Sequence, residues 1–372
     1  MTGKSPSRGG SWWESFPLRT THSLLNWLLL SVPIALLLGF AGWVSPLATF
    51  VLAALAIIPL AGVLGEATED LASHLGQGMG ALLNATMGNA TELIIAIFAL
   101  RAGHAEVVKA SLSGSIIGNV LLVLGLSVLV GGWKREKQVF SRQAAAVNST
   151  MLFIAVVALV MPAVFALSVF GHLREHGELV EKMSLWTSLV LIVVYLLSLR
   201  FAFGTHAAKD QEQHTSTRSA RSALVALTMA TILIAVLSEL LVSQIEATKQ
   251  ALGWSELFLG VIVIAIVGNA AEHGTAIVMA ARNKMDLALG IAIGSSAQIA
   301  LFVAPVLVFT AWLMGKPMSL IFVPMEIAGI ALAVLIVEMI SSDGETTWFE
   351  GVQLLAVYLI LAVAFYFVPS AT

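Results

Sequence analysis

Two short segments of this chain are near copies of each other, and each lies inside a long apolar run. The first is Gly88-Asn89-Ala90-Thr91-Glu92, and the second, in the other half of the chain, is Gly268-Asn269-Ala270-Ala271-Glu272. A Gly-Ser pair follows each glutamate at the same distance, as Gly114-Ser115 and Gly294-Ser295. The matching context on both sides indicates an internal repeat, in which each half contributes one carboxylate to a common site.

The composition favours a membrane protein. The 372 residues are 58% hydrophobic and 11% charged, whereas a soluble domain carries about 25% charged residues. We therefore expect an all-α polytopic membrane protein with the lipid bilayer as a partner. The net charge of -3 gives no indication of a nucleic-acid partner, and the absence of cysteine excludes disulfides, thiolate metal sites and cysteine nucleophiles.

About eleven apolar runs are long enough to cross a hydrocarbon core of ~30 Å. The predicted spans are 23–42, 47–73, 81–100, 107–131, 143–168, 184–203, 223–248, 256–281, 286–313, 319–340 and 348–368. No small-residue cleavage site follows the first run, so we interpret it as a transmembrane helix rather than a secretory signal. The second and seventh spans carry acidic residues, which makes a break or a tilt plausible there.

The longest polar connection between spans divides the chain into two similar parts. We predict a cytoplasmic N-terminus with the first helix over 1–45, one five-helix repeat over 46–204, a cytoplasmic linker over 205–222 and a second five-helix repeat over 223–368. Because five is odd, the second repeat enters the membrane with the opposite orientation. Inverted repeats are typical of secondary transporters, which bind their substrate near the midplane.

The distribution of positive charge predicts the orientation. With the N-terminus in the cytoplasm, 13 of the 19 Lys and Arg residues fall on the cytoplasmic side, as the positive-inside rule requires. The chain begins with a short polar stretch and carries no targeting segment, so we expect a bacterial inner membrane rather than a vacuole.

Glu92 and Glu272 are the strongest candidates for a functional site. A carboxylate at bilayer depth costs about 3 kcal/mol even on insertion scales, and no basic residue lies near either one in its span. A carboxyl group buried without a partner can hold a proton near neutral pH. Two brought together would bind either a divalent cation or protons, which is the competition an antiporter needs. The alternative is that each is a structural acid, hydrogen-bonded within the bundle.

Other residues of the repeats could complete an oxygen shell for a hard cation such as Ca²⁺, which takes six to eight oxygen ligands. Amides and hydroxyls could supply side-chain ligands, and glycines would permit a helix break with exposed carbonyls. The predicted ligand set beyond the glutamates is Asn89, Asn269, Gly88, Gly268, Ser115, Ser295, Gln298 and Asn119. Alternatively, the glycines serve tight helix packing and the polar residues bond neighbouring helices.

Further titratable residues are candidates for an ion path or a gate. They are Glu66, Glu69, Asp70, Glu239, Glu246 and His273. The five acids could equally lie at wetted helix ends, and His273 could bond a neighbouring helix rather than tune selectivity. The two repeat copies differ at two site positions: Leu93 corresponds to His273, and Asn119 corresponds to Ile299.

Motifs of other classes are missing. The sequence has no Walker loop for ATP, no His-Glu-x-x-His zinc motif and no Gly-x-Ser-x-Gly elbow in a plausible place. A cation channel or a membrane-embedded hydrolase is the hypothesis from another class. The inverted repeats argue against a channel, and the missing nucleophile and metal motifs argue against a hydrolase. We therefore expect a secondary transporter rather than an enzyme, with no cofactor.

The duplicated motifs resemble those of the Ca²⁺/cation antiporter superfamily and, within it, the Ca²⁺/H⁺ exchanger (CAX) family. The resemblance rests on the two Gly-Asn-x-x-Glu segments, on Glu272-His273 with Gly294-Ser295-Ser296-Ala297-Gln298, and on the run from Asp343 to Gly351. It implies an alternating-access exchanger with a central Ca²⁺/H⁺ site at the two glutamates and a first helix outside the repeats. The alternatives are Na⁺/H⁺, Mn²⁺/H⁺ or Na⁺/Ca²⁺ exchange on the same fold, and a homo-oligomer is compatible with the sequence.

Overall fold

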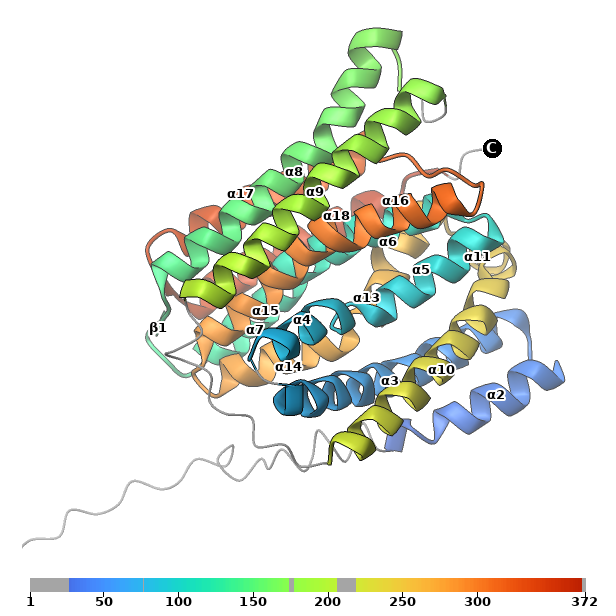
Figure 1. The fold of residues 1–372 in the computed structure, drawn as a ribbon, viewed down its shortest axis with the longest axis horizontal. Coiled ribbons are helices and arrows are strands. Elements are labelled where there is room, and N and C mark those ends of the chain that lie inside the picture. Colours follow the sequence, from blue (N-terminus) through green and yellow to red (C-terminus); the bar gives the residue numbers. More distant parts are fainter. Residues whose placement is uncertain (1–26, 76, 174–176, 206–218, 370–372) are drawn as a thin grey trace, which may run out of the picture.

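The computed structural model describes residues 27–75, 77–173, 177–205 and 219–369. Most of the predicted linker at 205–222 and the start of the predicted first span lie outside the described residues. Within them, the protein is a bundle of helices with one short two-stranded ribbon (Figure 1).

The first half of the chain forms one set of elements after a short leading helix, α2 (Ser31–Ala41). The set comprises α3 (Pro46–Leu75), α4 (Gln77–Met87), α5 (Ala90–Ala102), α6 (Ala105–Ile117), the π-helical segment η1 (Gly118–Val123), α7 (Leu124–Gly132), β1 (Gln138–Val139), α8 (Arg142–Phe170) and α9 (Glu178–Thr205).

The second half has a related order of elements. It comprises α10 (Ala220–Ser243), α11 (Ile245–Leu252), α12 (Glu256–Phe258), η2 (Leu259–Ile264), α13 (Ala265–Gly268), α14 (Ala270–Ala281), α15 (Met285–Gln298), η3 (Ile299–Val303), α16 (Ala304–Leu313), α17 (Pro324–Ser341), β2 (Glu345–Thr346) and α18 (Trp348–Tyr366). The starts of α5 and α6 match the starts of α14 and α15 at the same offset that relates Gly88 to Gly268.

The described part of the chain contains nine helices that are long and apolar enough to cross a membrane. A tenth is added if the pair Ile245–Leu252 and Glu256–Gly268, bent by 114°, counts as one broken span. The predicted all-α polytopic membrane fold is confirmed. The predicted number of eleven spans remains a prediction, because the described part of the first span is only the 11-residue helix α2.

Several predicted boundaries were wrong; the sixth span, for example, was predicted from residue 184, but α9 begins at Glu178. Two other differences have clear local reasons. The seventh span was predicted to run to residue 248, but α10 ends at Ser243, because Gln244 leaves helical geometry (φ -102°, ψ 0°). The tenth was predicted from residue 319, but α17 begins at Pro324. Proline favours the first helical position, and the Glu326 carboxylate accepts a hydrogen bond from the Val323 N–H (2.9 Å) to complete the cap.

Contacts between loops define two ends of the bundle. At one end β1 pairs with β2, and the Ser141 N–H donates to Asp286 Oδ1 (2.6 Å). At the other end, near α11, Lys109 Nζ donates to the Ile321 carbonyl (3.1 Å). We call these the ribbon end and the α11 end (Figure 1). The loops that follow the fourth, eighth and tenth predicted spans meet at the ribbon end, and the loops that follow the third and ninth spans meet at the α11 end.

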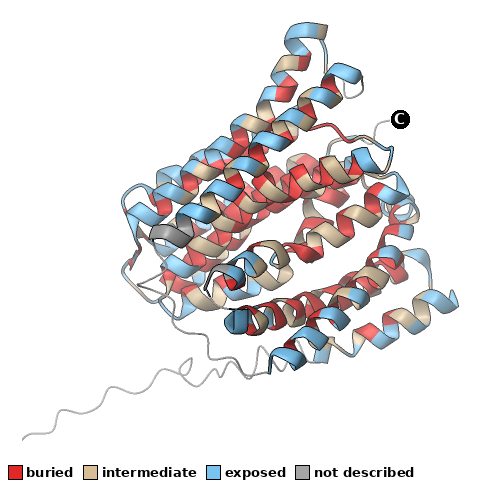
Figure 2. Cartoon of the chain, viewed as in Figure 1, coloured by how far each residue is buried: buried red, intermediate tan, exposed pale blue. Residues whose placement is uncertain are grey.

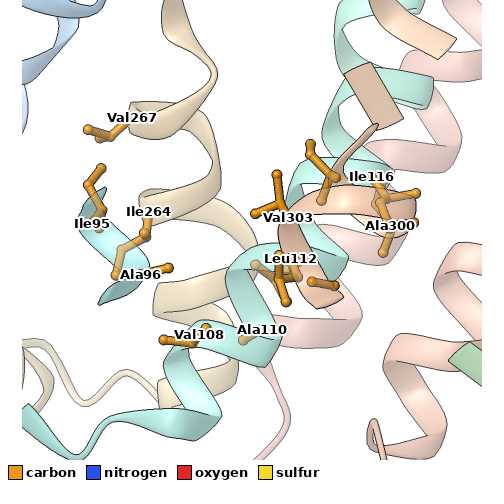
Figure 3. Packing of buried hydrophobic residues seen from close by; sticks show 14 of the residues in the cluster. Ile95, Ala96, Val108, Ala110, Leu112, Ile116, Ile264, Val267, Ala300 and Val303 are labelled. Carbon is orange, nitrogen blue, oxygen red and sulfur yellow. The ribbon is translucent and has the colours of Figure 1, made fainter. Parts of the chain in front are cut away.

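The centre of the bundle is built from repeat-related helices. In the helices over Ala105–Gly132 and Met285–Leu313, 78% and 72% of the most apolar stretch is buried inside the bundle. In α9 and α18 the corresponding shares are 22% and 28%. The outer helices carry many exposed large apolar residues, as expected of lipid-facing surfaces, and much of their length is coloured as exposed in Figure 2. In the core, Ile95 of α5 lies beside Ile264 and Val267 of the second repeat (Figure 3).

Candidate ion-binding site

Short interruptions in two helices place both glutamates. The first repeat is interrupted between Met87 and Ala90, and the second at Asn269, between α13 and α14. Glu92 and Glu272 therefore lie in the first turns of α5 and α14. The N-terminal end of a helix favours negative charge, so each interruption prepares an environment for a carboxylate inside the bundle.

The Glu92 carboxylate is buried without a hydrogen-bond partner from another residue at either oxygen. Its side chain packs against Gly268, where an added Cβ would lie 3.0 Å from Glu92 Cγ. Any larger residue at position 268 would press on Glu92. The predicted close approach at this glycine is therefore present in the second repeat. Gly88 is exposed, and only the Asn84 carbonyl lies near it.

The Glu272 carboxylate has one partner and one unpaired oxygen. The Ser295 hydroxyl donates a hydrogen bond to it, while its Oε2 atom is buried without a partner. Glu92 and Glu272 are close enough to interact electrostatically. The two repeats thus bring their acids into one site, as the duplication predicted.

The site asparagines bond amides on central helices of the opposite repeat. Asn89 Nδ2 donates to Gln298 Oε1 (2.7 Å), which leaves Asn89 Oδ1 buried without a partner. Asn269 Nδ2 donates to Ser115 Oγ (2.7 Å), and its Oδ1 accepts from Asn119 Nδ2 (3.1 Å). The predicted polar residues therefore gather at one place. Asn269 is hydrogen-bonded to both Ser115 and Asn119, whereas Asn89 keeps one oxygen without a partner.

The two positions at which the repeat copies differ are in contact. His273 Nε2 lies 3.2 Å from Asn119 Oδ1, to which the ring N–H donates. The corresponding residues of the other repeat are Leu93 and Ile299. The chain of bonds from His273 through Asn119 to Asn269 therefore exists on one side of the site only.

We expect the substitutions His273→Leu and Asn119→Ile, which copy the other repeat, to weaken cation binding in a coupled way. Each alone leaves a buried polar group unpaired, which costs ~1–3 kcal/mol. The double variant removes both members of the His273–Asn119 bond and leaves only Asn269 Oδ1 without its donor, so its loss should fall short of the summed single losses by at least about 0.5 kcal/mol. Cation affinities of the four proteins measure this, and strictly additive losses would contradict it.

Two glycines let central helices cross closely near the α11 end. An added Cβ would lie 2.5 Å from Val261 Cα at Gly114, and 2.7 Å from the Val107 carbonyl at Gly260. Because real Cβ atoms do not approach that closely, α6 and η2 are in backbone contact. The α6–η2 crossing joins one repeat to the other.

The repeat-related positions toward the ribbon end are different. Among the described residues, no atom beyond its chain neighbours and the backbone of its own helix lies within 4 Å of a Cβ added at Gly294. Gly80 faces its own repeat, with Ala72 C at 3.0 Å from its added Cβ. Gly80 and Gly294 are the repeat counterparts of Gly260 and Gly114, yet they do not make the same contact. Among the described residues, the two repeats therefore cross more closely at Gly114 and Gly260 than at Gly80 and Gly294.

The remaining candidates lie on the helices before the site. Glu66 and Glu69 are exposed on α3, and Asp70 is buried there. Glu239 is exposed on α10, and Glu246 forms an exposed ion pair with Lys249 (2.9 Å) on α11. Their predicted role in a path or gate stays a prediction.

The donor set has a definite chemistry. Four buried oxygens without partners belong to Asn89, Glu92 and Glu272, among the described residues. No three His, Asp or Glu side chains in the described ranges form a metal-binding group. A cation held here would therefore rely on two carboxylates supplemented by amide, hydroxyl, carbonyl or water oxygens, which suits a hard ion.

Comparison with known proteins fixes the family. The family model described as sodium/calcium exchanger protein matches residues 45–204 and 222–367. The chain belongs to this family. It is 44% identical over 361 residues to the Ca(2+)/H(+) antiporter of Aphanothece halophytica, covering 92% of this chain and 96% of that protein. It is 43% identical to the Ca(2+)/H(+) antiporter ChaA of Bacillus subtilis, covering 90% and 96%.

Solved structures agree with this placement in the exchanger family. The structure of native YfkE superposes with a TM-score of 0.81 at 41% identity, covering 93% of this chain and all of that one. The resemblance to Ca²⁺/H⁺ exchangers drawn from the two Gly-Asn-x-x-Glu segments is confirmed. Nothing in the sequence pattern indicated the role of Gly80 and Gly260, although the repeat offset relates these two glycines as well.

Proposed function

We propose that this protein exchanges Ca²⁺ for H⁺ across the membrane by alternating access, with cation and protons competing for Glu92 and Glu272. The observation that carries the proposal is the set of buried oxygens on Asn89, Glu92 and Glu272 that have no partner. Buried polar atoms in proteins are nearly always paired. Unpaired carboxylate oxygens gathered from two repeats therefore call for a ligand.

Charge explains why the two ions would alternate. Two carboxylates side by side in a low-dielectric interior repel each other, and a divalent cation neutralises both. Protons neutralise them as well, so the protein need not change conformation while both carboxylates are charged and unoccupied. This coupling makes net movement of one ion depend on return of the other.

The unequal helix crossings support alternating access. Gly114 and Gly260 bring the backbones of α6 and η2 into contact near the α11 end, whereas an added Cβ at Gly294 meets no described atom beyond its chain neighbours and its own helix backbone. We infer that the site communicates with the ribbon end here, and that the mirror-related crossing of α15 and α4 closes that end in the other state.

The names of the relatives favour Ca²⁺/H⁺ exchange over Na⁺/H⁺, Mn²⁺/H⁺ or Na⁺/Ca²⁺ exchange. The test is radiolabelled Ca²⁺ uptake into proteoliposomes with an imposed pH gradient, with Mn²⁺ and Na⁺ as competitors. We expect uptake that stops when an ionophore collapses the gradient. Uptake driven by Na⁺ instead, or a current independent of the pH gradient, would contradict the proposal and favour another exchanger or a channel.

We further propose that the ribbon end faces the cytoplasm of a bacterial cell, with the N-terminus on the same side. The loops at this end carry Lys134, Arg135, Lys137, Arg282 and Lys284, as the positive-inside rule favours. Cysteine accessibility at position 137 in intact cells tests this: labelling by an impermeant reagent only after permeabilisation is expected. Whether the protein forms a homo-oligomer stays a prediction.

A further inference from the structure

The run from Asp343 to Gly351 builds the ribbon rather than the ion site. Asp343 Oδ1 accepts from the Glu345 N–H (3.0 Å), and Glu350 Oε2 accepts from the Thr347 N–H (2.7 Å). These local bonds fix β2 so that Thr346 pairs with Gln138 of β1. The run therefore holds the loop between α7 and α8 in a defined place at the ribbon end.

That loop presents Arg135 to the ends of two parallel helices. Arg135 Nη2 donates to the Ala281 carbonyl at the end of α14 (3.0 Å), and its Nη1 donates to the Gly131 carbonyl at the end of α7. At the end of α14, the carbonyls of Val278, Met279 and Ala280 accept hydrogen bonds from the backbone N–H groups of residues 282–284. Arg135 thus takes the next carbonyl, Ala281.

Lys316 does the same at the opposite end of the bundle. It follows α16, and its Nζ atom donates to the Arg101 carbonyl near the end of α5 (2.7 Å). The terminal turn of α5 pairs the carbonyls of Ala99 and Leu100 and does not use Arg101. Arg101 and Ala281 are repeat counterparts, and Lys316 lies one position beyond the counterpart of Arg135, so the two caps are related by the repeat.

Each cap therefore joins the two repeats across the site. Arg135 comes from the first repeat and caps α14, whose first turn carries Glu272. Lys316 comes from the second repeat and caps α5, whose first turn carries Glu92. We propose that Arg135 and Lys316 are positioning residues for the ion site, which hold the two glutamate-bearing half-helices at their far ends.

The physical reason is the stiffness and the polarity of a short helix. The helix from Glu272 to Ala281 is about 14 Å of rigid structure, so a tilt at one end displaces the other. Helix C-termini carry partial negative charge, and a cation there is stabilising. Arg135 also lies between two such ends, α7 and α14, which would otherwise repel each other. The inference rests on the proposed ion site at the two glutamates.

The test compares neutral and charge-conserving variants of the full-length protein. We expect Arg135→Gln and Lys316→Gln to weaken equilibrium Ca²⁺ binding by purified protein about 3- to 10-fold, and Arg135→Lys to restore most of the affinity. Hydrogen exchange followed by mass spectrometry should show faster exchange over residues 270–284 in Arg135→Gln and over residues 90–104 in Lys316→Gln, each without change elsewhere.

Matched controls lie in the same regions. Lys137 pairs with Glu345 (2.8 Å) in the ribbon loop, and Lys182 pairs with Glu178 on α9. The hydrogen bond to Glu345, then its charge, raises the pKa of Lys137, so this control is charged at neutral pH. Exposed pairs contribute little, so Lys137→Gln and Lys182→Gln should match the parent protein in both measurements.

The outcomes separate this inference from the proposed function. The inference would be overturned if Arg135→Gln and Lys316→Gln kept the parental Ca²⁺ affinity and the parental hydrogen-exchange rates. It would also be overturned if the Lys137 and Lys182 controls lost as much Ca²⁺ affinity, or if hydrogen exchange became faster over the whole chain. If the parent protein binds no Ca²⁺, the proposed function fails, while the local hydrogen-exchange result still decides whether Arg135 and Lys316 hold their half-helices.

Discussion

Replacement of Glu92 or Glu272 by Gln is expected to abolish pH-driven Ca²⁺ uptake in proteoliposomes. Glutamine keeps the size of the side chain but cannot supply the negative charge or accept the proton. Removal of one partner from a buried charge contact costs about 2–5 kcal/mol, and about 3 kcal/mol corresponds to a loss of about 100-fold. The protein should still fold, because Glu92 has no hydrogen-bond partner from another residue to lose, and Glu272→Gln keeps an oxygen that can accept from the Ser295 hydroxyl.

The matched control is another buried acid. Glu326 is 2% exposed and accepts from Ser113 Oγ (2.8 Å) and from the Val323 N–H near the α11 end. Glu326→Gln keeps one oxygen for the Val323 N–H, and Ser113 Oγ can donate to the Ala110 carbonyl (3.0 Å) while it accepts from the new amide, so uptake should remain close to that of the parent protein. Parental uptake by either site variant, in protein of normal yield and monodispersity, would show that Glu92 and Glu272 do not carry the coupled ions.

The site could be predicted largely because the repeat duplicates its chemistry. Asn89 and Asn269 stand three residues before the glutamates, and the structure places their amides against Gln298 and Asn119. Spacing along helices was enough for this, because residues three or four apart share a helix face. The pairing of His273 with Asn119 needed the fold, since the sequence showed only that each breaks the repeat.

The sequence could not show that helices cross at different distances in the two halves of the chain. Gly114 and Gly294 occupy equivalent places in the repeat, yet an added Cβ at Gly114 meets the backbone of η2, whereas one at Gly294 meets no described atom beyond its chain neighbours and its own helix backbone. A sequence encodes both states of a transporter at once, and the choice between them depends on small energy differences. The helix start at Pro324 was readable in principle, but the apolar residues before it continue the hydrophobic run.

Gly294→Leu is expected to fold and to bind Ca²⁺, but to exchange it at least about 100-fold more slowly. Beyond its chain neighbours and own helix backbone, no described atom lies within 4 Å of a Cβ added at position 294, so we expect the present conformation to accommodate the larger side chain. In the mirror-related state Gly294 would take the place that Gly114 has here, with an added Cβ 2.5 Å from Val261 Cα. Overpacking against backbone should cost at least about 3 kcal/mol, the upper end of the usual range, so the variant should remain in the present conformation. Ca²⁺ binding and pH-driven uptake, measured together, separate these effects.

A second glycine shows whether the effect belongs to the crossing or to any added bulk. Gly274 of α14 is exposed and has no heavy atom within 4 Å of an added Cβ. Its repeat counterpart is Ile94, so the environment that position 274 would enter in the mirror-related state already accommodates isoleucine. Gly274→Ile should therefore keep Ca²⁺ exchange near the parental rate, although position 274 is nearer to Glu272 along the chain than position 294 is. If Gly294→Leu exchanges as fast as Gly274→Ile, the α15–α4 crossing does not close during transport, and the two repeats do not exchange roles.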